Sequence, residues 1–273
     1  MSSPTLSPSG DLIGAQSLQR SFPTARTISA LVLREMTTRF GRTPGGFLWA
    51  LLQPLATIII LGMAFSLLAR SPALGTSFIL FKATGMMPFQ TFRSNSTMVG
   101  GSISYSRSLL MYPGVTWVDA LLARFILNTL VMIVVTALIL VGIVVVQGVT
   151  LIMDWNAVIL SMALSAFLGL GVGTLNCFLT ERIEIWSRIW QILNAPLMIL
   201  SGVLMLPESL PTDIQYWLYY NPLIHLTGLM RQGFYSTYQP QYVSITYVLL
   251  WSMIPLMLGL ILLRRYHREL INR

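Results

Sequence analysis

Long stretches without a charged residue constrain the fold of this chain more than any other feature. The clearest follows Arg42, where residues 43–69 (TPGGFLWALLQPLATIIILGMAFSLLA) carry no charge at all. Only 10% of all residues are charged and the mean hydropathy is +0.71, whereas soluble domains carry about 25% charged residues. Because a helix rises about 1.5 Å per residue, roughly 20 apolar residues cross the ~30 Å hydrocarbon core of a bilayer. The sequence therefore predicts an all-α integral membrane protein.

Six segments have the composition of transmembrane helices. They are residues 46–69, 77–98, 120–146, 155–179, 188–206 and 243–263. Most arginines lie before the first span, between the second and third, between the fourth and fifth, or after the last, whereas only Arg70 and Arg231 lie on the opposite side. Cytoplasmic loops of membrane proteins carry the excess of arginine and lysine. We therefore expect both termini to be cytoplasmic.

The parts outside the spans differ in composition. Residues 1–25 are rich in Ser and Pro and lack the apolar core of a signal peptide, so we interpret them as a flexible N-terminal tail. Residues 26–268 are expected to form one transmembrane domain, and residues 269–273 a cytoplasmic C-terminal end. The second span holds Lys82 and Arg93 near its two ends, where long side chains can reach the interface. Contact with an anionic substrate is the alternative role for these cations.

A short helix is expected at the cytoplasmic interface over residues 26–41. Its apolar residues gather on one side, as in a helix lying in the plane of the interface: Ile28, Leu31, Val32, Met36 and Phe40. Glu35 and Arg39, an i,i+4 pair, project from the same arc. This arrangement favours a helix that faces a protein or charged headgroups in addition to lipid.

Two further segments predict local structure. In the fourth span, small residues at every fourth position (Ser161, Ser165, Gly169 and Gly173) allow close helix packing, either within the bundle or across a dimer. Prolines cut residues 206–240 into pieces too short to span, which predicts short re-entrant helices on the outer side. Thr212 or Asp213 is a candidate cap for the first of them, and Asn221 followed by Pro222 is a typical start for the second.

Residues for chemistry are scarce. Lys82 is the only lysine and no Walker A sequence surrounds it, so this chain binds no nucleotide by that route. The single Cys177 forms no internal disulfide, and His225 and His267 do not predict a metal site. The nine acidic residues form no catalytic cluster and no intramembrane proton relay. We therefore expect no catalytic residue, no metal and no cofactor in this chain, which is interpreted as a permease rather than an enzyme.

Two stretches carry a resemblance to a known family. LREMTTRFGRTPGGFLWALLQP (33–54) and YWLYYNPLIHLTGLMRQGFY (216–235) resemble the permease subunits of ABC-2 type (type V) exporters of capsular polysaccharide. The resemblance covers about residues 26–268. It implies six transmembrane helices, a cytoplasmic interfacial helix and periplasmic re-entrant helices, all in a bacterial inner membrane.

The resemblance also implies partners and cargo. Two copies of such a permease bind two copies of a separate ATPase, which holds ATP and magnesium, and no nucleic acid takes part. The cargo is a lipid-linked polysaccharide, in capsule systems with a phosphatidylglycerol-type anchor and acidic Kdo sugars, and periplasmic adaptor and outer-membrane export proteins continue the route. The alternatives are a permease for O-antigen, teichoic acid or another glycolipid, and a non-transporting membrane component of glycan assembly.

By resemblance, residues 100–114 contain the coupling helix that meets the ATPase; a plain interfacial loop is the alternative. The residues assigned to this contact are Ser104, Tyr105, Arg107, Leu110 and Tyr112. The first and fifth spans are implied to line the path of the polysaccharide. Residues assigned to contact with substrate or lipid headgroups are Arg34, Arg39, Arg42, Phe47, Trp49, Trp186 and Trp190.

Each of these contacts has a competing explanation. Arginines also attract anionic lipid, and aromatic residues also form the belt at a membrane interface. On the outer re-entrant helices the candidate residues are Trp217, Tyr220, His225 and Arg231, for which we expect packing or headgroup contacts rather than a gate.

Overall fold

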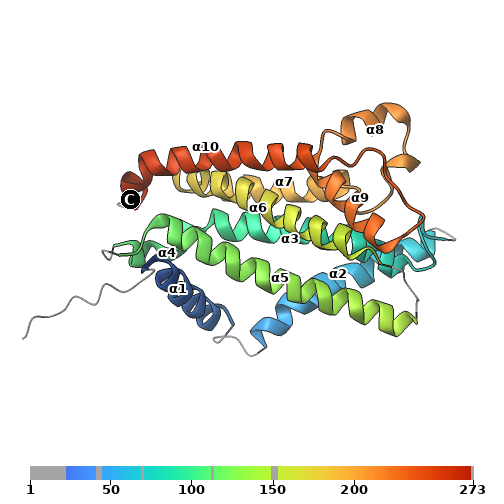
Figure 1. Cartoon of the computed structure of the whole chain (residues 1–273), viewed down its shortest axis with the longest axis horizontal. Coiled ribbons are helices and arrows are strands. Elements are labelled where there is room, and N and C mark those ends of the chain that lie inside the picture. The colour runs from blue at the N-terminus through green and yellow to red at the C-terminus, as the bar shows by residue number, and fades with distance from the viewer. Residues whose placement is uncertain (1–22, 41–44, 69–70, 112–113, 149–152, 272–273) are drawn as a thin grey trace, which may run out of the picture.

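The computed structural model describes residues 23–40, 45–68, 71–111, 114–148 and 153–271. These residues form ten α-helices and one 3-10 turn. The helices are α1 (Pro23–Phe40), α2 (Gly46–Leu68), α3 (Phe78–Gly100), α4 (Ser102–Leu110), α5 (Trp117–Gln147), α6 (Trp155–Arg182), α7 (Trp186–Leu200), α8 (Thr212–Leu218), α9 (Pro222–Phe234) and α10 (Ile245–Ile271), with the turn η1 at Pro207–Ser209. α1 and α4 lie near one end of an elongated bundle and α8 and α9 near the other (Figure 1).

All six predicted spans are helical, and four of them have the length and hydropathy of membrane-spanning helices. These four are Gly46–Leu67, Trp117–Gln147, Trp155–Arg182 and Ile245–His267. α3 has enough residues, but it carries Lys82, Arg93 and a polar stretch at its inner end. α7 has only 15 residues, which rise about 22 Å.

The helix predicted over 26–41 is α1, which begins at Pro23, so the last residues of the predicted tail are helical. Residues 1–22 of that tail lie outside the described part. At the other end, α10 continues to Ile271, and residues 272–273 are likewise outside it. The fifth span, predicted to reach residue 206, ends at Leu200, and the chain then turns at Gly202, whose φ is +71°. Such a positive φ suits glycine because it has no Cβ.

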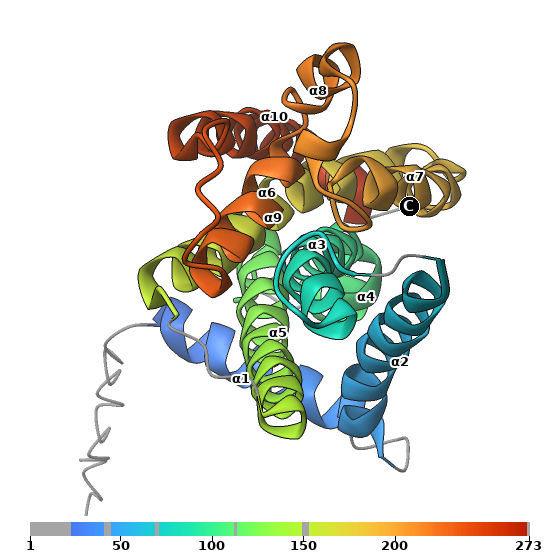
Figure 2. The same ribbon diagram turned by 90° about the vertical axis from the view of Figure 1, so that its right-hand side faces the viewer.

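α3 is the central helix of the bundle. It packs against α2, α5, α6 and α9, and Figure 2, viewed along the bundle, shows it between α2 and α5, with α6 and α9 beyond. Its side chains are buried on nearly every face. α3 therefore lies in the core of the bundle, surrounded by other helices. This position explains how a predicted span can carry two cations without facing lipid.

The small residues of α6 serve packing within the bundle. A Cβ at Gly169 would lie 2.9 Å from the carbonyl oxygen of Phe92 on α3, and one at Gly173 would lie 2.7 Å from Cβ of Val99. Ser161 donates a hydrogen bond to the carbonyl oxygen of Leu226 on α9 at 2.8 Å. The sequence left open whether these small residues pack within the bundle or across a dimer. The structure shows that they allow close packing within one chain.

Polar residues at helix ends explain where several helices begin. Thr116 and Asp119 form a reciprocal capping box on α5, and Asp154 caps α6. Asn221 caps α9 with Pro222 at its first position, as predicted. The predicted cap of α8 is wrong: Thr212 and Asp213 lie inside the helix, which follows Pro211 without a side-chain cap.

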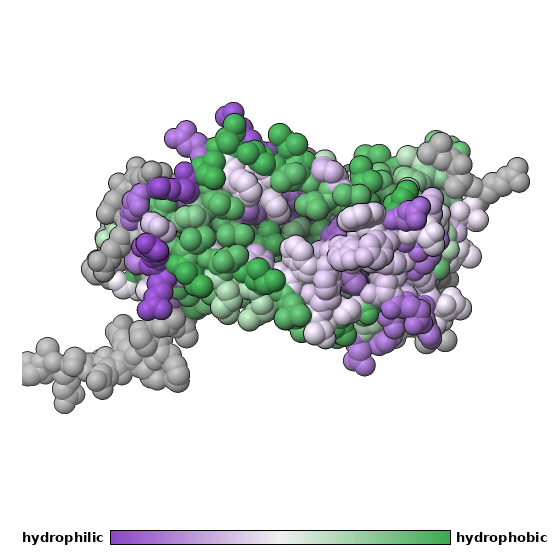
Figure 3. Space-filling view, turned by 90° about the horizontal axis from the view of Figure 1, so that it is seen from above, coloured by the Kyte–Doolittle hydropathy of each residue, from purple (hydrophilic) through white to green (hydrophobic). Residues whose placement is uncertain are grey.

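The surface has the distribution of polarity expected for a membrane protein. Figure 3 shows a broad band of hydrophobic residues, with strongly hydrophilic residues gathered toward the two ends. Large apolar side chains are exposed along α2, α5 and α10, for example Leu67, Val146 and Ile261. These faces suit contact with lipid tails or with another apolar surface.

Candidate coupling and substrate-contact sites

α4, the helix within the predicted coupling segment, is fixed to α6 by one carboxylate. Glu181, at the inner end of α6, accepts a hydrogen bond from Ser104 and an ion-paired one from Arg107 Nη2 at 2.6 Å. The Glu181 side chain is 5% exposed, whereas that of Arg107 is 36% exposed. These two contacts tie α4 directly to a long helix of the bundle.

α4 is also joined to α1 and α5 through a cluster that we call the Arg124 junction: Glu35, Thr38, Gly101, Tyr105 and Arg124. Arg124 Nε donates to Glu35 Oε1 at 2.7 Å, and Nη1 donates to the carbonyl oxygen of Gly101 at 2.7 Å. The guanidinium lies 4.3 Å from the centre of the Tyr105 ring, a cation–π distance. The Tyr105 hydroxyl in turn shares a 2.9 Å hydrogen bond with Thr38.

A second polar connection runs from α1 into the bundle. Arg39 Nη1 donates to Asn128 Oδ1 at 3.1 Å, and the same oxygen accepts from Ser94 on α3 at 3.0 Å. Asn128 Nδ2 continues the chain to Asn95 Oδ1. Burial lowers the pKa of Arg39, although nearby Glu35 opposes this effect. Glu35 and Arg39 therefore project from the apolar arc of α1 because they face protein.

Of the remaining predicted coupling residues, Leu110 packs against a small apolar core at this end of the bundle, beside Ile103 and Leu263. Tyr112 lies outside the described residues. On the side of α4 that faces away from the bundle, the exposed residues are Ser104, Tyr105 and Ser108. Met111, directly after the helix, is exposed as well. These residues form the surface that α4 leaves open to a partner.

The predicted substrate-contact residues do not form one cluster. Arg34 is exposed on α1, and Arg42 lies outside the described residues. Phe47 and Trp49, at the start of α2, are 39% and 65% exposed. They present aromatic surface to lipid or to a ligand.

The two tryptophans of α7 point inward instead. Trp186 Nε1 donates to Asn176 on α6 at 3.0 Å. Trp190 packs edge-on against Phe92 of α3, with ring centroids 6.5 Å apart. In this conformation they hold α7 to the bundle.

The outer helices present an exposed aromatic group. Trp217 lies on α8 and is 73% exposed, and Tyr220 lies just after this helix and is 52% exposed. The Tyr216 ring packs edge-on against both. Such amphipathic rings suit the headgroup layer.

His225 lies on α9, and its side chain is buried. Its Nδ1 accepts from the Ser244 amide at 3.1 Å, and Nε2 lies 2.9 Å from the carbonyl oxygen of Tyr219. Only the neutral tautomer with a proton on Nε2 satisfies both contacts. Burial lowers the pKa of His225, in agreement with this neutral state.

Arg231 on α9 and Lys82 on α3 are both buried, at 0% and 1% exposure. Neither side chain reaches the protein surface in this structure. Lys82 donates inward to the carbonyl oxygen of Leu204 and does not snorkel to the surface.

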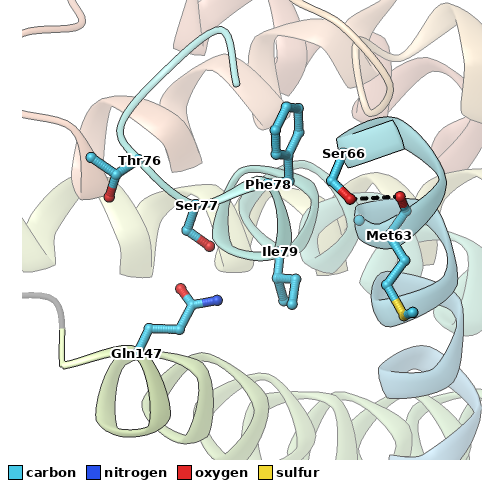
Figure 4. A pocket seen from close by; sticks show the side chains of 8 residues that line it. Met63, Ser66, Thr76, Ser77, Phe78, Ile79 and Gln147 are labelled. Atoms are coloured by element: carbon cyan, nitrogen blue, oxygen red, sulfur yellow. Dashed lines mark hydrogen bonds between the residues drawn. The ribbon is translucent and has the colours of Figure 1, made fainter. Parts of the chain in front are cut away.

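A pocket of about 390 Å³ opens at the outer ends of α2, α3 and α5. Figure 4 shows Met63 and Ser66 from α2, the start of α3 at Ser77, and Gln147 from α5 around it. Ser66 donates to the carbonyl oxygen of Met63. The lining carries no charge, so the pocket does not by itself indicate an ionic ligand. Within the described ranges, no group of three or more His, Cys, Asp and Glu could hold a metal ion.

Sequence reasoning missed the residues that join the predicted site together. Arg124, Asn128 and Glu181 were not among the candidate site residues, yet they bind α1, α3 and α4. One signal was present: Glu35 stands in an apolar arc on α1, and Arg124 is an isolated cation inside a predicted span. Buried opposite charges of this kind tend to pair.

Comparisons with known proteins place this geometry in context. The family model for ABC-2 type transporters matches residues 26–235. The polysialic acid transport protein KpsM of Escherichia coli is 31% identical over 248 residues, which are 90% of this chain and 95% of that protein. The capsule polysaccharide export inner-membrane proteins of Neisseria meningitidis (CtrC) and Haemophilus influenzae (BexB) are 27% and 26% identical over 243 residues, 89% of this chain and 92% of each.

Proposed function

Because this chain belongs to the ABC-2 type transporter family, we propose that it is the transmembrane subunit of an ATP-driven exporter of capsular polysaccharide in a bacterial inner membrane. The observation that carries this proposal is the likeness over about nine-tenths of the chain to proteins named for capsule polysaccharide export and polysialic acid transport. A permease of this family works with a separate ATPase subunit. The chain itself is the membrane part, without an ATPase domain.

We assign α2, α3, α5, α6, α7 and α10 as six transmembrane helices, with α1 and α4 on the cytoplasmic side. The distribution of arginines supports this orientation, since they gather before α2, around α4 and in the C-terminal part of α10. α8 and α9 are then re-entrant periplasmic helices. This assignment adds α3 and α7 to the four helices whose length and hydropathy suit a membrane span.

The assembly that we propose contains two copies of this chain and two ATPase subunits that bind ATP and magnesium. The exposed face of α4 with Tyr105, together with Met111 directly after the helix, is the surface proposed to meet the ATPase. Its attachments to Glu181 and to the Arg124 junction support this role because they connect α4 with α6, α5 and α1. The cargo is a lipid-linked polysaccharide, which periplasmic adaptor and outer-membrane export proteins receive.

Genetic complementation tests the proposal. In a capsulated strain that lacks its own export permease, this chain expressed with its ATPase should restore surface capsule. Without it, finished polymer should accumulate in the cytoplasm. Restoration of O-antigen instead of capsule would change the cargo, whereas loss of polymer synthesis would indicate a role in glycan assembly and contradict transport.

Purification gives a second, independent test. The chain should co-purify with its ATPase, and ATP hydrolysis in that complex should depend on the permease. If no P-loop ATPase binds the chain, the proposed mechanism fails.

A further inference from the structure

The outer half of the bundle contains two buried cations without a counter-ion. Lys82 on α3 and Arg231 on α9 are among the largest fully buried side chains. The three ion pairs found among the described residues involve neither of them. Burying an uncompensated charge is costly, so a protein that keeps two such cations usually has a use for them.

Among the described residues, the hydrogen-bond acceptors of these cations are neutral carbonyl groups. Arg231 Nη2 donates to the carbonyl oxygen of Val203 at 3.3 Å, and Lys82 donates to that of Leu204. Nε and Nη1 of Arg231 have no hydrogen-bond partner in the described part of the chain. The guanidinium therefore has unused donors, although Arg can bind a carboxylate or phosphate with two parallel hydrogen bonds.

Aromatic rings complete the surroundings of the two cations. The Arg231 guanidinium lies 4.2 Å from the centre of the Phe81 ring, and Lys82 Nζ lies 3.3 Å from that of Phe65. Cation–π contacts of this kind offset part of the desolvation cost but supply no negative charge.

Among the described residues, Glu208 is the one acidic residue with an electrostatic effect on Arg231, but it is hydrogen-bonded to another group. Glu208 is exposed on η1 and accepts a 2.8 Å hydrogen bond from Tyr238. It forms no ion pair with either cation among the described residues. The two cations therefore lack a directly bonded carboxylate in the described part of the chain.

A short segment covers the two cations. Residues 201–206 follow α7, turn at Gly202 and bring the carbonyl groups of Val203 and Leu204 onto the cations. Gly85 of α3 leaves room for this contact, since a Cβ there would lie 2.9 Å from Arg231 Nη2 and 3.1 Å from Cα of Val203.

We propose that Lys82 and Arg231 form a binding site for an anionic group, a phosphodiester or a sugar carboxylate, and that residues 201–206 cover it in this conformation. The carbonyl oxygens of Val203 and Leu204 occupy positions that anionic oxygens take when the segment moves aside. This inference rests on the proposed function, because a lipid-linked polysaccharide offers both kinds of anion. It places a contact for the cargo near the outer end of the path.

Binding to the purified full-length chain, in complex with its ATPase and in neutral maltoside micelles, tests the site. The probes are short-chain phosphatidylglycerol, free sialic acid and, as a zwitterionic control, short-chain phosphatidylcholine. We expect Lys82→Gln and Arg231→Gln each to weaken binding of one anionic probe about ten- to a hundredfold. Arg264→Gln, which removes an exposed cation on α10, should bind that probe like the wild type.

The preferred probe identifies the source of the anion. Tighter binding of phosphatidylglycerol assigns the site to a lipid phosphate, and tighter binding of sialic acid assigns it to a sugar carboxylate. The site is refuted if the wild type binds neither anion more tightly than phosphatidylcholine, or if both glutamine variants bind as the wild type does.

A labelling experiment covers the case in which the glutamine variants fail to fold. Val203 is fully buried, whereas Met205 in the same segment is 40% exposed. A cysteine in Val203→Cys should react slowly with a membrane-impermeant thiol reagent, and several-fold faster when the anionic probe is present. Met205→Cys is the matched control and should react readily in both conditions. Native Cys177 is buried, and an unchanged rate at position 203 would overturn the proposed movement.

Failure of the site and failure of the proposed function are distinguishable. Complementation of capsule export by the wild-type chain tests the function. If that export is normal and anion binding does not depend on Lys82 or Arg231, only the site is wrong.

Discussion

Arg124 on α5 and Glu35 on α1 form an ion pair of 2.7 Å whose side chains are only 10% and 9% exposed. Removing one partner of such a pair leaves an uncompensated buried charge and costs about 3–5 kcal/mol. Arg124 also binds the carbonyl oxygen of Gly101, the residue directly before α4. The interfacial helix and the proposed coupling helix are therefore held by one side chain, and a displacement of α4 reaches α1 through it.

A double-mutant cycle on this pair should reveal strong coupling. Glu35→Gln and Arg124→Gln should each lower the thermal stability of the purified chain, and the double variant should lose less than the sum, with a coupling of about 0.5–3 kcal/mol. The control is the Arg182–Glu269 pair, which has a similar distance of 2.9 Å but side chains 47% and 50% exposed. Its cycle should give only about 0–1 kcal/mol. Additive losses at Glu35 and Arg124 would contradict the role of the junction.

Breaking the contact between α4 and α6 should reduce the coupling of ATP hydrolysis to export more than it reduces the stability of the protein. Glu181→Gln removes the charge that Arg107 contacts and weakens the bond from Ser104. We expect ATP hydrolysis to continue while export falls, because movement of α4 no longer reaches α6. ATPase activity and capsule export are measured on the same strain, with Glu184→Gln, an exposed acid three residues away, as the control. Equal effects of the two variants would show that general loss of negative charge is responsible.

Local patterns predicted most of the fold. Apolar runs located six helices, and Asn221 with Pro222 located the start of α9, because hydropathy and capping depend on neighbours in sequence. The end of the fifth span was placed six residues too late, since the apolar residues after Leu200 continue past the turn at Gly202. Composition alone does not record the positive φ that stops the helix.

The site was predicted less completely because its contacts join distant parts of the chain. Glu35 and Arg124 are 89 residues apart. The sequence marks each of them as a charge in apolar surroundings, but it does not show that the two side chains meet. Lys82 was expected to reach the interface because hydropathy considers each cation alone. Its burial depends on α3 being surrounded by other helices, which is a tertiary property.

Acid pH should loosen the outer helices through His225. Burial lowers its pKa below the ordinary value of 6.5, so the folded state resists protonation that the unfolded state accepts. The contribution of neutral His225 to the free energy of unfolding is therefore fully present above about pH 6.5. It is lost as the pH falls from there toward the lower pKa of the folded state. Thermal unfolding between about pH 8 and about pH 5 measures this loss.

His225→Gln should remove this part of the acid sensitivity, because a glutamine amide offers both a donor for Tyr219 and an acceptor for Ser244. The rings of Tyr242 and Tyr247 that pack on His225 do not change. His267→Gln, at the other end of α10, is the control and should keep the wild-type loss. The explanation is wrong if both glutamine variants retain the same pH dependence.

Two glycines in membrane helices should respond in opposite ways to alanine. A Cβ at Gly171 of α6 would lie 2.2 Å from the carbonyl oxygen of Ser252 on α10, whereas one at Gly142 of α5 would meet nothing within 4 Å. Gly171→Ala must push α10 away and should cost about 3 kcal/mol, the upper range for overpacking. Gly142→Ala should be neutral or gain about 0.5–1 kcal/mol from helix propensity. Thermal unfolding of both variants in the same micelle compares them, and similar losses would show that α6 and α10 do not depend on this close approach.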